Sequence, residues 1–149
     1  MTTSWLLIWN PRLFDIASLK AKLKTFAKRR SVKFSWSCSE TKAIRKGDRV
    51  FLMRVGLEPR GLVGSGYALG APWEAARWDD EKKRTNYVDV QWDWIDPEPL
   101  ILRAELDQPG FAGVRWSPQR SGIQIKGQAA DTLERAWTAR RADRNAPVM

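Results

Sequence analysis

The chain of 149 residues contains no histidine and a single cysteine, Cys38. Without histidine it cannot build a Ser-His-Asp triad, a Cys-His pair or a histidine-dependent nuclease centre. A structural zinc site, with its four Cys or His ligands, is excluded for the same reason. One cysteine cannot form an internal disulfide, which is typical of a reducing compartment, so we expect a cytoplasmic protein. Composition leaves room for a magnesium site made of carboxylates, but no cluster of them stands out. We therefore expect neither a metal nor a cofactor.

Long apolar runs are also missing from the sequence. The apolar stretch at Ser4–Trp9 is far shorter than the roughly 18 residues of a membrane span. No basic segment precedes it, so it does not resemble a signal peptide. We expect no membrane partner. The length fits a single domain, which we place at residues 1–142, with a flexible tail or linker at 143–149.

What the sequence does contain is basic charge and tryptophan: a net charge of +9 and nine Trp residues. The first 60 residues hold 14 Lys or Arg against 4 Asp or Glu, whereas residues 61–149 hold 12 against 13. This asymmetry exceeds what solubility alone requires, and a one-sided positive field attracts polyanions. Exposed indole faces suit stacked nucleobases. The combination predicts a nucleic-acid partner.

The hydrophobic pattern predicts an α+β fold. Alternation or short apolar runs indicate strands near residues 5–9, 32–37, 49–55, 62–69, 87–95, 100–102, 111–116 and 123–125. Helical spacing indicates one helix from Asp15 or Ser18 to about Arg29, and another at 128–141. Residues 71–85 appear as a long polar connection that carries Trp73 and Trp78. Three glycines in the strand at 62–69 and its start indicate bending or close backbone approach. We expect a small mixed β-barrel with flanking helices.

Several cations are candidates for phosphate contacts. Lys20 and Lys24 follow one edge of the first helix, and the alternative is that they simply form its solvated face. The full candidate set is Lys20, Lys24, Lys33, Lys42 and Arg45. Among the tryptophans, Trp5, Trp92 and Trp137 lie on apolar faces and are expected in the core. Cys38 is expected to be a small packed residue.

Several short motifs resemble one branch of a known superfamily. They are Trp36-Ser37-Cys38-Ser39, the stretch from Gly47 to Leu52, the stretch from Pro59 to Gly64, Val90–Ile95 and Trp116–Gly122. Together they resemble the EVE-like and YTH-like branch of the PUA superfamily, from about Trp5 to Trp137. The stretch Trp116–Gly122 is similar to EVE-like domains found before HNH nucleases in modification-dependent restriction enzymes.

This resemblance implies a small PUA-like barrel that holds a flipped or unpaired modified base in an aromatic cage. Trp36 falls where the first cage tryptophan stands, and Ser37 falls where a backbone group contacts the base edge. Asn10 falls near the polar base-reading position, and Trp73 is the candidate for the opposing wall. The candidate base-binding residues are Trp9, Asn10, Trp36, Ser37, Ser39 and Trp73.

One departure from the family bears on the choice of base. The first strand ends in Trp9-Asn10-Pro11, where YTH-like domains carry a polar run. This favours 5-methylcytosine or 5-hydroxymethylcytosine in DNA over N6-methyladenine in RNA. The chain lacks the HNH nuclease, so we expect a non-catalytic reader that stands alone or serves as the sensing domain of a nuclease.

Three alternatives stay open at the level of sequence. The first is an RNA reader of the same fold. The second is a small amidohydrolase of the related ASCH type, for which Ser39-Glu40-Thr41-Lys42 offers the residue types. The third is a protein-interaction module without a base pocket.

Overall fold

The computed structural model describes residues 2–145. No helix in this part of the chain is both long enough and apolar enough to span a membrane. In chain order the elements are β1 (Ser4–Trp9), α1 (Ile16–Arg29), β2 (Val32–Ser39), β3 (Arg49–Arg54), β4 (Gly61–Ala68), β5 (Trp73–Arg77), β6 (Asp80–Ile95), β7 (Ile101–Leu102), the 3₁₀ turns η1 (Arg103–Asp107) and η2 (Pro109–Phe111), β8 (Ile123–Ile125) and α2 (Gly127–Asn145).

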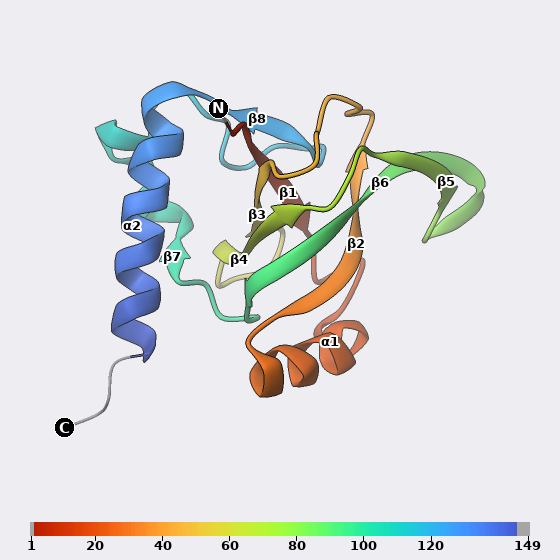
Figure 1. The fold of residues 1–149 in the computed structure, drawn as a ribbon, viewed down its shortest axis with the longest axis horizontal. Coiled ribbons are helices and arrows are strands. Elements are labelled where there is room, and N and C mark those ends of the chain that lie inside the picture. Colours follow the sequence, from red (N-terminus) through yellow and green to blue (C-terminus); the bar gives the residue numbers. More distant parts are fainter. Residues whose placement is uncertain (1, 146–149) are drawn as a thin grey trace.

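The strands form one mixed sheet in the order β2-β6-β4-β3-β1-β8, with β5 added to β6 and β7 to β4. β1 and β3 are parallel, and the other pairs are antiparallel. The sheet curls, so that β2 at one end of the path approaches β1 near the other end. There the Trp36 indole N–H donates to the backbone oxygen of Ile8 at 2.8 Å. Helices α1 and α2 flank the sheet (Figure 1). The expected α+β class with a curled mixed sheet and flanking helices is confirmed.

The core follows the alternation in the sequence. On β6, Val88, Val90 and Trp92 are fully buried on one face. The predicted core positions Trp5 and Trp137 are also buried. Trp94 and Trp116 are buried as well. Most of the nine indoles therefore serve the fold and not a ligand.

Gly66 shows why β4 is rich in glycine. A Cβ atom at this position would lie 2.5 Å from the backbone oxygen of Gln91 on β6. Only a residue without a side chain lets the two strands approach so closely. The close backbone approach predicted for this strand is confirmed.

Helix α1 begins and ends as the sequence signals predict. The Asp15 side chain accepts a hydrogen bond from the Ser18 backbone N–H, so Asp15 is the N-cap. At the other end Arg30 adopts a left-handed conformation with φ 60° and stops the helix. Leu19 and Phe26, which lie seven residues apart on the same face of the helix, are its buried residues.

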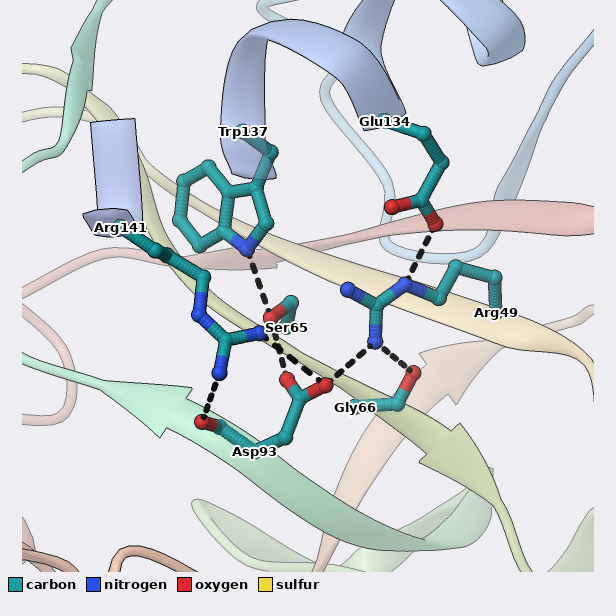
Figure 2. A network of polar contacts seen from close by, with 7 residues as sticks. All are labelled: Arg49, Ser65, Gly66, Asp93, Glu134, Trp137 and Arg141. Atoms are coloured by element: carbon teal, nitrogen blue, oxygen red, sulfur yellow. Dashed lines mark hydrogen bonds and ion pairs between the residues drawn. The ribbon is translucent and has the colours of Figure 1, made fainter. Parts of the chain in front are cut away.

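Helix α2 is held against the sheet by polar contacts (Figure 2). The indole N–H of Trp137 donates to Ser65 Oγ at 2.8 Å, and the Ser65 hydroxyl donates in turn to Asp93. Arg49, whose side chain is only 5% exposed, pairs with Asp93 at 3.0 Å and with Glu134 at 2.6 Å. Burial opposes the charge of Arg49, but attraction to the two carboxylates outweighs it and raises the pKa of this guanidinium.

Two of the expected elements are wrong. Residues 71–85 are not a long connection, because Trp73–Arg77 and the outer half of β6 pair as an antiparallel hairpin. This hairpin projects from the barrel (Figure 1). Residues 111–116 do not form a strand, and the chain there leaves a 3₁₀ turn that begins at Pro109. Helix α2 runs on to Asn145 and so includes the start of the expected tail, while 146–149 lie outside the described residues.

Candidate functional site

A cavity of about 370 Å³ lies between the β1–α1 loop, strand β2 and the turn of the β5–β6 hairpin. We call it the aromatic cavity. Its aromatic lining residues are Trp9, Phe14, Trp36, Trp78 and Tyr87, and its polar ones include Asn10, Ser35, Ser37, Ser39, Gln119 and Ser121. A cavity of this size with apolar walls and a few polar groups is typical of sites for small, flat organic ligands.

Three rings form the aromatic centre of this cavity. Phe14 makes an edge contact with Trp36, with ring centroids 5.4 Å apart, and a second edge contact with Trp78 at the same distance. Trp36 comes from the barrel strand β2, whereas Trp78 comes from the hairpin turn. Phe14, in the β1–α1 loop, connects the two. Trp78 is 48% exposed, so it offers surface to a ligand.

The orientation of Trp36 follows from its strand position and one hydrogen bond. Val32, Phe34, Trp36 and Cys38 alternate on the inner face of β2, and Trp36 is only partly buried between the core residues Val32 and Cys38. The bond from its indole N–H to the Ile8 oxygen then fixes the ring. Trp9 lies behind, 1% exposed, with its indole N–H donating to the Phe14 oxygen. Trp9 therefore forms part of the floor and supports the loop that carries Phe14.

Asn10 is held by its neighbours at the edge of the cavity. Its side-chain oxygen accepts from the Arg12 backbone N–H at 3.0 Å. Gly56 packs against the same amide, and a Cβ there would lie 2.5 Å from Asn10 Oδ1. Gly56 also has φ +78°, a conformation that favours glycine. The amide is thus positioned by contacts on two sides.

A second, charged cavity of about 660 Å³ adjoins the first and shares Ser37, Ser39, Arg77, Trp78 and Gln119 with it. Its cations are Lys42, Arg77, Arg84 and Arg120, and its carboxylates are Glu40 and Glu74. Arg84 pairs with Glu74 and Arg120 with Glu40, all on the surface. The hydrogen bond from Arg84 lowers the pKa of Glu74, and Lys42 adds to this effect. Exposed ion pairs are weak, so a phosphate group could displace either carboxylate.

The structure brings most of the predicted base-binding residues together. Trp9, Asn10, Trp36, Ser37 and Ser39 all line the aromatic cavity. Trp73 does not line it. Its ring stacks on Tyr87 with centroids 5.1 Å apart, and its indole N–H donates to Asp89. Because Tyr87 itself lines the cavity, Trp73 lies one layer behind the wall that it was expected to form.

Sequence reasoning did not single out Phe14, Tyr87 and Ser121, and it chose Trp73 for the opposing wall, whereas the tryptophan of this segment that lines the cavity is Trp78. Trp78 lines the cavity together with Trp36, and both indoles contact Phe14. If residues 73–86 had been recognised as a hairpin, Trp78 would have been placed at its turn. Polar residues lie on both faces of this hairpin, however, so its sequence does not alternate between apolar and polar residues as a half-buried strand does.

The candidate phosphate-binding cations are spread over several surfaces. Lys42 lines the charged cavity. Lys20 and Lys24 are exposed on α1, and Lys33 is exposed on β2. Arg45 is exposed in the loop before β3, where its guanidinium donates to the backbone oxygens of Lys42 and Ile44. Only Lys42 among these five residues lines either cavity.

The segment with the residue types of an amidohydrolase is engaged in structural contacts. The Thr41 hydroxyl donates to the Gly122 oxygen, and Glu40 pairs with Arg120. Cys38 is fully buried, and this burial raises its pKa to about 11, so it is a packed residue as expected. Within residues 2–145 no group of three or more Cys, Asp or Glu side chains is placed to hold a metal ion.

Known proteins resemble this chain in structure and not in sequence. No family model and no curated protein matches it. A hypothetical protein from Leishmania major has a TM-score of 0.64 at 15% identity, over 97% of this chain and 98% of that one. Human THYN1 protein in complex with 5-methylcytosine containing DNA has a TM-score of 0.60 at 14% identity, over 98% and 100%. The YTH domain-containing protein mmi1 in complex with RNA has a TM-score of 0.53 at 11% identity, over 95% and 83%. The chain therefore shares the fold of these proteins over nearly its whole length.

Proposed function

We propose that this protein is a non-catalytic reader of modified nucleic acid, which holds an unstacked base between Trp36 and Trp78. The observation that carries the proposal is the aromatic cavity itself, where two indoles from separate elements meet around Phe14. A base has a flat π-face and stacks on such rings regardless of its hydrogen-bonding edge. The adjoining cations would contact the sugar-phosphate backbone.

Shared folds support the choice of ligand. THYN1 carries 5-methylcytosine containing DNA, and mmi1 carries RNA, in structures of this architecture. Together with the motifs in the sequence, this supports membership of the EVE-like branch and a preference for DNA that contains 5-methylcytosine or 5-hydroxymethylcytosine. A role as the sensing domain of a modification-dependent nuclease belongs to the same proposal.

Energetics limit what stacking alone can achieve. Stacking contributes about 1–3 kcal/mol per base, and flipping a base out of a duplex costs a few kcal/mol. Phosphate contacts must therefore add to the total. One buried methyl group adds about 0.8 kcal/mol, which is only about fourfold in affinity. Discrimination beyond this value requires polar groups that meet the edge of the base.

Binding of labelled oligonucleotides at fixed salt tests the proposal. We expect Trp36→Ala to weaken binding of a strand with one 5-methylcytosine by about 5- to 150-fold, from the loss of one stacking face. Trp78→Ala should act in the same range. Trp73→Ala is the matched control, because it removes an exposed indole that does not line the cavity, and its effect should be several-fold smaller.

The outcome against the proposal is equal affinity for modified and unmodified strands together with no effect of Trp36→Ala. RNA of the same sequence with N6-methyladenine is the second probe, because the mmi1 structure contains RNA. Stronger binding of this RNA than of the methylated DNA would assign the cavity to the RNA reader instead.

A further inference from the structure

Ile8 connects two groups of the aromatic cavity through its backbone. β8 pairs with β1 only at Ser4–Leu6. Beyond Leu6 this edge of β1 has no strand partner, so the backbone N–H and oxygen of Ile8 can bond to other groups. The Ile8 oxygen accepts from the Trp36 indole at 2.8 Å, and the Ile8 N–H donates to Ser121 Oγ at 3.0 Å. One residue of β1 thus fixes an aromatic wall and a hydroxyl group relative to each other.

The loop that carries Ser121 is firmly held. The Gly122 N–H donates to the Leu6 oxygen at 2.9 Å, and the Gly122 oxygen accepts from the Thr41 hydroxyl. Gly122 has φ +90°, and a Cβ there would lie 2.5 Å from the Cys38 oxygen. The loop therefore cannot shift without breaking contacts to both β1 and the end of β2.

Ser121 is only 7% exposed, yet it lines the aromatic cavity. A serine hydroxyl has one hydrogen and two lone pairs. The Ile8 N–H occupies one lone pair, and no acceptor within residues 2–145 takes the hydrogen. A buried hydroxyl group of this kind gains free energy when a ligand supplies the missing acceptor.

The hydroxyl of Ser37 in the same cavity is in a different state. The hydroxyl groups of Ser37 and Thr85 share a hydrogen bond of 3.2 Å, in which either group can be the donor. Ser37 also accepts from the Ser39 N–H. Ser37 thus has a hydroxyl partner inside the protein, whereas the more deeply buried Ser121 hydroxyl only accepts within residues 2–145 and keeps its hydrogen for a ligand.

We propose that Ser121 is a specificity-determining residue, whose hydroxyl donates to a ring nitrogen or carbonyl oxygen on the edge of the base held beside Trp36. This inference rests on the proposed function and deepens it. It gives the stretch Trp116–Gly122 a role in reading the base that neither Trp36 nor Trp78 can perform, since stacking does not distinguish one edge from another.

The test compares a single-stranded DNA that contains one 5-methylcytosine with the same strand carrying an abasic site at that position. We expect Ser121→Ala to weaken binding of the 5-methylcytosine strand by about 3- to 10-fold and to leave the abasic strand unchanged. Ser117→Ala is the matched control, because Ser117 lies in the same stretch but does not line the aromatic cavity, and it should change the ratio between the two strands by less than twofold. Ser121→Cys keeps a side chain of similar size but offers only a weak donor, so it should show the same selective loss on the 5-methylcytosine strand. It is the second variant, for use if Ser121→Ala does not fold.

An equal loss on both strands would mean that Ser121 acts only by supporting Ile8, and no loss on either strand would mean that it does not meet the base. Either result overturns the inference while Trp36→Ala still weakens binding of the 5-methylcytosine strand. Failure of the proposed function would give a different result. The wild-type protein would then bind the 5-methylcytosine strand and the abasic strand equally, and Trp36→Ala would have no effect.

Discussion

Arg49 offers a sharp test of how α2 is attached to the barrel. Its guanidinium contacts Asp93, Glu134 and the Gly66 oxygen, and its side chain is 5% exposed. Removing one partner of a buried ion pair costs about 3–5 kcal/mol. The two carboxylates are 30% and 40% exposed, so water can solvate them in part once the guanidinium is gone. We therefore expect Arg49→Met to lower the free energy of unfolding by about 2–3 kcal/mol, less than for a fully buried pair.

Urea denaturation, followed by tryptophan fluorescence, measures this change. With a slope of about 2 kcal/mol per molar urea, the midpoint should fall by about 1–1.5 M. Arg135→Met is the matched control, because Arg135 is exposed on the same helix and forms no ion pair with the residues that the structure describes. A shift below about 0.3 M for Arg49→Met, or an equal shift for both variants, would refute the view that this network attaches the helix (Figure 2).

Two further predictions concern the core. Gly66→Ala should destabilise the fold by about 1–3 kcal/mol, because its Cβ would lie 2.5 Å from the Gln91 oxygen, whereas Gly70→Ala, with no atom within 4 Å, should stay within about 0.5 kcal/mol in the same urea assay. Burial raises the pKa of Cys38 to about 11 in the folded protein, so its contribution to stability is fully present below about pH 9 and is lost as pH rises toward 11. Unfolding curves of the wild type and Cys38→Ala should accordingly converge by about 2–3 kcal/mol between pH 8 and pH 11, and a constant difference would contradict this assignment.

The hydrophobic periodicity of the sequence was sufficient to predict the helices and strands that bury one face. The alternation of Val88, Val90 and Trp92 and the capped stripe of α1 predict those elements because burial imposes a period on the sequence. The β5–β6 hairpin leaves the barrel and exposes both of its faces, so no such period marks it. The same reason explains why Trp78, at its turn, was not recognised as a wall.

The lining of the candidate site was predictable where a local motif carries it. Trp36, Ser37 and Ser39 share one strand, and the resemblance of this strand to known domains was enough to place them at the cavity. Ser121 and Phe14 come from loops that reach the cavity only through long-range contacts, such as the bond from Ile8 to Ser121. No spacing in the sequence encodes these contacts.

The two aromatic walls differ in what holds them. Trp36 belongs to a barrel strand and is bonded to the backbone of β1, whereas Trp78 lies on the turn of a hairpin whose outer residues are largely exposed. A change in hairpin length or turn sequence would therefore move one wall and leave the other in place. The width of the gap between Trp36 and Trp78 can therefore change without any cost to the barrel core, and in the function proposed above this width would set the size of the base that fits.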